Sequence, residues 1–92
     1  MIKTSNSSFP SNKKLAEATI KALEDFGKAM SVPQINVKVI EILDLPDEIV
    51  QLEDENGLGT KLEYRLRWIR TDLKTKGKIV NLKKGFWQLK EN

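Results

Sequence analysis

The sequence predicts an α+β fold of the winged helix-turn-helix type, with three main helices followed by a C-terminal β-hairpin that forms the wing. Two helical patterns carry capping residues, a third helix has a narrow apolar stripe, and two short apolar runs flank a glycine-containing loop. The 92 residues suffice for one domain with a single core. We expect this domain to span residues 11–92, after a polar, flexible lead-in at residues 1–10.

The first helix is expected over residues 12–26. Ser11 is placed to cap its N-terminus, because a serine oxygen can accept a hydrogen bond from an N–H group of the first turn. Gly27 follows as its C-terminal stop. Residues at helical spacing form one face of this helix: Leu15, Thr19, Ala22, Leu23 and Phe26.

Residues 28–30 form a short connector with room for one strand's width of extended chain, and the segment after it allows two interpretations. Its β-branched residues at positions 35, 37 and 39 alternate like a strand, whereas the apolar residues at 35, 39, 42 and 43 form a helical stripe. Ser31 as a cap and Pro33 in the first turn favour the helix. A short helical turn over residues 47–52 and an acidic, glycine-containing loop over residues 53–59 complete this region.

The third helix is expected from Thr60 to Lys76, with Gly77 as its stop. At 100° per residue, four apolar residues fall within about 60° of each other and predict a buried stripe. They are Leu62, Leu66, Ile69 and Leu73. The opposite side carries Thr60, Tyr64, Arg67 and Thr71, flanked by Trp68 and Lys74.

Two strands are expected over residues 78–82 and 86–90, joined by a three-residue loop, Lys83-Lys84-Gly85, in which the glycine takes a positive φ. Trp87 is in phase with Leu89 and is expected in the core. Trp68 lies beside the buried stripe, where a tryptophan more often closes the edge of a core than stacks on a base.

The composition argues against catalysis by this chain. It has no cysteine and no histidine, which excludes thiolate or histidine zinc sites and serine or cysteine triads. Its acidic clusters at 47–48 and 53–55 are consecutive loop residues, without the spacing of a metal nuclease. We therefore expect no enzyme activity, no catalytic or metal-binding residue and no cofactor. No segment approaches the roughly 20 apolar residues of a membrane span, and residues 1–8 lack a signal-peptide core, so a cytoplasmic protein is expected.

Charge is unevenly distributed along the chain. Residues 1–59 carry six basic and ten acidic residues, a net charge of −4, whereas residues 60–92 carry ten basic and three acidic residues, a net charge of +7. Such a basic third is typical of a protein that binds a polyanion. A solvated, lysine-rich surface is the alternative, and charge alone does not separate the two.

From Pro10 onward the chain resembles the N-terminal winged-helix domain of Mrr-type restriction endonucleases. The likeness is carried by residues 65–74 with their tryptophan, by Gly77, and by residues 84–89; residues 45–48 also resemble the acidic turn after the family's second helix. This resemblance implies DNA binding by a module that targets a separate nuclease domain, often in systems that recognise modified bases. It also supports a helix over residues 33–43. The negative charge at 53–55 departs from the family pattern.

We therefore interpret the chain as a duplex-DNA-binding module whose helix at 60–76 enters the major groove while the hairpin lies along the backbone. Arg67 and Tyr64 are expected at base edges, Lys83 and Lys84 at phosphates, and Arg65 and Arg70 at phosphates or in ion pairs. The predicted DNA-binding residues are Thr60, Lys61, Tyr64, Arg65, Arg67, Thr71, Lys74, Lys83 and Lys84.

The expected partners are double-stranded DNA and a nuclease domain in cis or in trans, with a homodimer left open and no membrane partner. A winged helix that mediates oligomerisation or docks a nuclease is the alternative of a different class. A transcriptional regulator is a weaker one, because a fold alone does not determine function. The charged face opposite the apolar stripe favours nucleic acid over protein docking.

Overall fold

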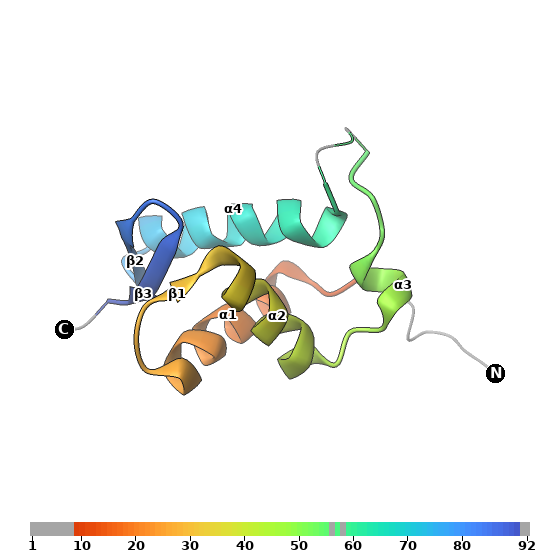
Figure 1. The fold of residues 1–92 in the computed structure, drawn as a ribbon. Coiled ribbons are helices and arrows are strands. Elements are labelled where there is room, and N and C mark those ends of the chain that lie inside the picture. Colours follow the sequence, from red (N-terminus) through yellow and green to blue (C-terminus); the bar gives the residue numbers. More distant parts are fainter. Residues whose placement is uncertain (1–8, 56, 58, 91–92) are drawn as a thin grey trace.

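A computed structural model describes residues 9–55, 57 and 59–90 of the chain. Three antiparallel strands form one sheet, in the order β1-β3-β2, at one end of a helical body (Figure 1). This α+β arrangement fits a winged helix and confirms the predicted fold class. The elements are α1 (Asn12–Phe26), β1 (Met30–Ser31), α2 (Val32–Leu43), α3 (Asp47–Val50), α4 (Lys61–Thr75), β2 (Ile79–Lys83) and β3 (Phe86–Leu89).

The helices begin where side chains cap them. The Ser11 hydroxyl accepts a hydrogen bond from the backbone N–H of Lys14 at 3.2 Å. Ser31 and Gln34 form a reciprocal capping box at the start of α2, which resolves the ambiguous segment in favour of a helix. Thr60 and Glu63 form a second capping box at the start of α4. The predicted helices are confirmed to within a few residues at each end.

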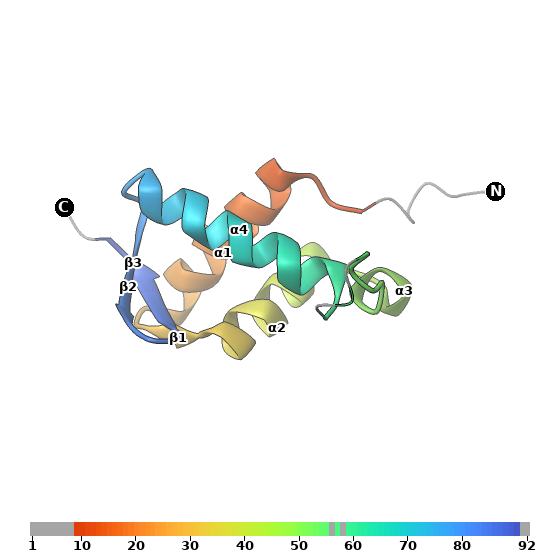
Figure 2. The ribbon, with the colours of Figure 1, turned by 90° about the horizontal axis from the view of Figure 1, so that it is seen from above.

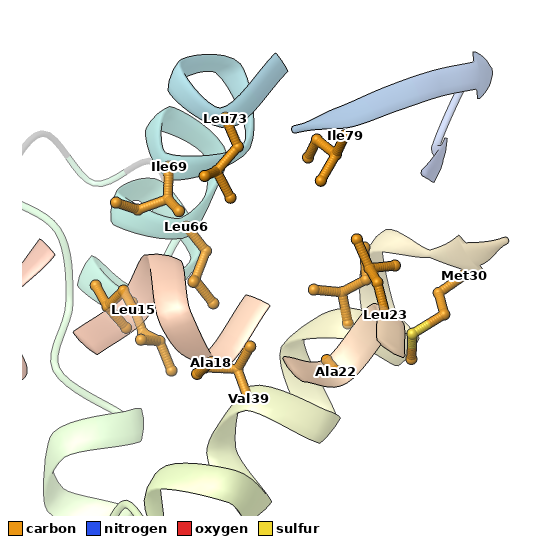
Figure 3. Packing of buried hydrophobic residues seen from close by; sticks show 12 residues of the cluster. Leu15, Ala18, Ala22, Leu23, Met30, Val39, Leu66, Ile69, Leu73 and Ile79 are labelled. Carbon is orange, nitrogen blue, oxygen red and sulfur yellow. The ribbon is translucent and has the colours of Figure 1, made fainter. Parts of the chain in front are cut away.

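The core lies between the lower face of α4, α1 and α2, and the sheet closes one end of it. All four residues of the α4 stripe, Leu62, Leu66, Ile69 and Leu73, are at most 6% exposed, as predicted. Figure 3 shows Leu66, Ile69 and Leu73 pointing toward the helix that carries Leu15. Because this stripe is fully used by the core, the opposite side of α4 is free to contact something else.

Seen from above, α4 lies on top of the helical body; α1 begins on one side of it and passes beneath, and α2 lies on the other side (Figure 2). The two flanks of α4 therefore face different surroundings, α1 on one flank and α2 with the sheet on the other. This geometry sorts the predicted site residues into separate groups.

Two expectations need correction or refinement. The hairpin loop is shorter than predicted, because Lys83 pairs with Phe86 in the strand ladder and only Lys84 and Gly85 form the turn. The strand pairing shifts register between Asn81 and Lys83. Here the side-chain amide of Asn81 donates hydrogen bonds to the backbone carbonyls of Lys83 and Phe86, both at 2.8 Å. Trp87 packs against the core as predicted, but it is half-buried.

The lead-in predicted for residues 1–10 falls mostly on residues 1–8, which lie outside the described residues. Phe9, near its end, is half-buried and packs against the core. Residues 56 and 58 of the predicted acidic loop also lie outside the described residues.

Candidate nucleic-acid interface

The upper side of α4 presents a short basic ridge. Arg67, Thr71 and Lys74 are exposed, and the Thr71 hydroxyl donates to the backbone carbonyl of Arg67 at 3.2 Å. Within the described part of the chain, neither Arg67 nor Lys74 has a carboxylate within ion-pair distance. Their charges are therefore available to an external anion.

Tyr64 and Trp68 form an aromatic pair next to this ridge. Their ring centroids are 6.3 Å apart and the planes meet at 74°, an edge-to-face arrangement. The expectation that Trp68 closes the core edge is wrong, because its side chain is 55% exposed. Ile69 and Leu73 complete the apolar stripe on this part of α4. Trp68 lies outside the stripe, about 100° around the helix axis from Ile69.

Three other predicted contact residues are engaged within the domain. Thr60 caps α4, accepting a hydrogen bond from the Glu63 N–H at 3.1 Å. Lys61 and Arg65 lie over the ring of Phe9, at 4.7 and 5.2 Å from its centroid. Arg65 also donates to the Asn12 side chain at 2.9 Å. Lys61 and Arg65 therefore lie toward the start of α1, on a different flank of α4 from Arg67.

The end of β2 and the turn that follows it carry the two remaining predicted residues. Lys83 and Lys84 are exposed, and the Lys83 ammonium lies 4.9 Å from the centroid of the Phe86 ring. The Gly85 carbonyl accepts a hydrogen bond from the Val32 N–H at 3.0 Å, which ties the turn to the start of α2. Gly85 has φ 82°, as the sequence predicted for the glycine of this loop. In Figure 1 the turn rises to the height of α4.

The sequence analysis expected Arg70 at a phosphate or in an ion pair and did not predict that this side chain is buried. It is only 6% exposed, and its guanidinium lies 6.0 Å from the centroid of the Trp87 ring. Burial lowers the pKa of the Arg70 guanidinium below its usual value, and the charge of Arg67 lowers this pKa further. Its position four residues after Leu66 and three before Leu73 was the available signal, because that spacing places it beside the buried stripe.

The opposite end of α4 is acidic. The loop before the helix folds back so that Glu53 bridges to Thr60, and the Lys61 N–H donates to the Leu52 carbonyl at 2.8 Å. Glu53 and Glu55 are exposed there. Figure 1 shows this loop projecting beyond the start of α4, at the end away from the wing. The upper surface is therefore negative at one end and positive at the other.

A groove of about 940 Å³ runs between α1 and α4 on the flank away from α2. Trp68 stands at its side, and the groove contains the apolar side chains of Ala16, Ile20, Ile69 and Leu73. Charged side chains of both signs surround them: Lys13, Glu17, Lys21, Glu24, Arg65, Asp72, Lys76 and Lys78.

The model of the Mrr N-terminal domain family matches residues 13–92, nearly the whole chain. The chain belongs to this family. The Mrr N-terminal domain is a non-catalytic module associated with Mrr-type restriction systems. No curated protein and no solved structure matches the chain.

Two further findings concern the described residues of this Mrr N-terminal domain. None of its helices there has the length and apolarity needed to cross a membrane. Across residues 9–55, 57 and 59–90, no three acidic side chains gather where they could hold a metal ion.

Proposed function

We propose that this Mrr N-terminal domain binds duplex DNA and thereby targets a nuclease domain, in cis or in trans. The observation that carries the proposal is the difference between the buried and the exposed side of α4. Its apolar stripe is wholly buried, while Arg67 and Lys74 stand unpaired, within the described chain, on the exposed side. A helix with this pattern can dock on its own core and still present donors to the major groove.

The predicted DNA-binding residues divide into those that contact bases and those that contact the DNA backbone. Arg67 reads a base edge, because arginine donates two parallel hydrogen bonds to guanine, and Tyr64 and Thr71 contact neighbouring bases. Lys74, Lys83 and Lys84 hold phosphates and fix the orientation of α4. Thr60, Lys61 and Arg65 contact the backbone at the start of α4, where Arg65 still has donors beyond the one that it gives to Asn12.

A modified base is a candidate target of the same surface. The exposed face of Trp68 beside Tyr64 offers apolar contact to a methyl group in the major groove. Two duplexes of identical sequence, one methylated and one not, test this part of the proposal directly. Equal affinities would show that the domain does not recognise the methyl group and would leave duplex binding itself intact.

Salt dependence is the first test of DNA binding. Fluorescence anisotropy with a labelled duplex of about 20 base pairs is measured at about 50 and 200 mM salt. The cations assigned to phosphates, Lys61, Arg65, Lys74, Lys83 and Lys84, predict a slope of about −4.5, so affinity falls about 500-fold between these concentrations. Lys28→Ala is the matched control, because Lys28 lies in the α1–β1 connector, away from α4 (Figure 1). A wild-type domain that fails to bind at the lower salt contradicts the proposal.

Protein docking is the second candidate function, and the groove between α1 and α4 favours it. An exposed tryptophan over an apolar hollow is typical of an interface. The occupant would be the nuclease domain or a second copy of this domain. Sedimentation analysis of the wild type and of Ile20→Glu tests the second copy: a dimer that the substitution dissociates supports it, and a monomer at all concentrations excludes it.

A further inference from the structure

The side chain of Arg70 is buried without a counter-charge. It is 94% buried, its Nη1 atom has no hydrogen-bond partner, and no ion pair of the described chain includes it. The carboxylates nearest in sequence are used elsewhere: Glu63 accepts from the Thr60 N–H, and Asp72 pairs with Lys76 at 3.0 Å. The fold therefore leaves this guanidinium uncompensated.

An uncompensated buried cation is costly. Desolvation disfavours the charged form, and replacing such a group by an apolar side chain of similar volume is often neutral or stabilising. The lowered pKa of Arg70 has the same origin, burial first and the charge of Arg67 second. The ring of Trp87, 6.0 Å away, offers an aromatic face and no hydrogen-bond acceptor. Within the described residues, no carboxylate offsets the cost of burying this charge.

The neighbours of Arg70 on α4 are also basic. Arg67 lies three residues before it and Lys74 four residues after it, so the three side chains share one flank of the helix. This is the flank that faces the wing, since Arg70 contacts Trp87 of β3. Within the described chain, no carboxylate pairs with any of these three cations. Together they form a strip of positive charge that attracts an anion able to accept more than one hydrogen bond.

We infer that Arg70 and Lys74, beside the base-reading Arg67, form a phosphate site at the junction of α4 and the wing, which takes one backbone phosphate of duplex DNA. The inference rests on the proposed DNA binding. The exposed Lys74 draws the phosphate in, and Arg70 turns its guanidinium outward from beneath the Trp87 ring to meet it. Because the Arg70 side chain is 94% buried, this contact fixes the depth and angle of α4 in the groove more tightly than a flexible lysine would.

The test compares stability with binding in Arg70→Met. The expected result is a melting temperature about 4–8 °C above that of the wild type, because the uncompensated charge is gone. Affinity for duplex DNA falls about 10-fold or more, and the salt slope loses about 0.9. Arg70→Lys keeps the charge and is expected to retain most of the slope. Arg67→Met is the matched control: it weakens binding with no gain in melting temperature, because Arg67 is exposed.

A second measurement does not depend on DNA. At constant ionic strength, exchanging chloride for inorganic phosphate raises the melting temperature of the wild type, because the anion binds the folded state alone. Arg70→Met loses the part of this shift that comes from the site and keeps the general stabilisation by phosphate as an excluded salt. Circular dichroism melts in the two buffers provide the comparison.

The outcomes separate the inference from the function on which it rests. A wild type that binds DNA, with Arg70→Met equal to it in affinity, slope and phosphate shift, refutes the phosphate site and leaves DNA binding standing. Arg70→Met that is less stable and binds DNA normally shows a structural role and also refutes the site. A wild type that binds no DNA refutes the proposed function and the DNA source; a phosphate shift lost in Arg70→Met then supports a site for a free phosphate.

Discussion

Substitutions in the wing and in α4 are expected to change DNA binding in different ways. In the proposed binding mode, Lys83 and Lys84 of the wing contact phosphates, whereas Arg67 on the exposed side of α4 contacts bases. Replacing both lysines by alanine removes two phosphate contacts and about 1.8 from the salt slope. The loss of affinity between about 50 and 200 mM salt then becomes about 12-fold smaller than in the wild type. Affinity falls equally for all sequences.

Arg67→Ala has a different expected signature. A base contact discriminates between sequences by about 1–3 kcal/mol, so the variant loses about 5- to 150-fold of its preference for the best duplex over a random one. Both variants stay folded, because none of these three side chains belongs to the core cluster.

The assay requires a preferred duplex, selected from a random pool with the wild-type domain. Anisotropy titrations against that duplex and a scrambled one, at two salt concentrations, then give the preference and the slope for each variant. If Arg67→Ala lowers affinity for both duplexes equally and the preference survives, α4 is not the reading element. The specific contacts would then belong to the wing or to the loop before α4.

Three further predictions concern stability and the acidic loop. Trp87→Ala is expected to destabilise the domain by about 2–3 kcal/mol, below the usual cost for a fully buried tryptophan since Trp87 is half-buried; an unchanged melt would show that it adds nothing to the core. Thr60→Ala breaks the α4 capping box and should cost about 1 kcal/mol by chemical denaturation, whereas Thr60→Ser should retain most of it. Replacing Glu53 and Glu55 by glutamine should raise affinity for every duplex, more at low salt than at high salt, in anisotropy titrations; a change confined to one sequence would contradict simple repulsion.

Much of the fold was predictable because local signals agreed with each other. Ser11 and Ser31 accept the capping hydrogen bonds that the sequence predicted. Thr60, where the third helix was expected to begin, also accepts one. The α4 stripe was predicted correctly because four residues at helical spacing leave one way to bury them. The strand-like alternation in α2 was overruled by the capping box formed by Ser31 and Gln34, a local interaction that the sequence also contains.

The surroundings of single side chains were harder to predict, because they depend on what another element brings near. Trp68 could have closed the core if α1 had approached it, but the groove between the two helices leaves it exposed. Arg65 was expected at phosphates or in an ion pair, and the structure gives it Phe9 and Asn12, more than 50 residues away in sequence. The periodicity of α4 does not predict these contacts of Arg65, because they depend on how the chain before α1 crosses the helix.

The two flanks of α4 are chemically independent, which bears on how a targeting module could serve a nuclease. The flank toward the wing carries Arg67, Arg70 and Lys74, and the flank toward α1 carries Trp68 above the apolar groove. A duplex on the upper side and the wing would leave the groove side of α1 uncovered, so DNA and a protein partner could bind at the same time. In that arrangement, a change deep in the groove such as Ile20→Glu disturbs protein docking alone, while Arg70→Met disturbs DNA binding alone. If instead either substitution weakened both activities, the two surfaces would have to overlap at Trp68, the residue that stands between them.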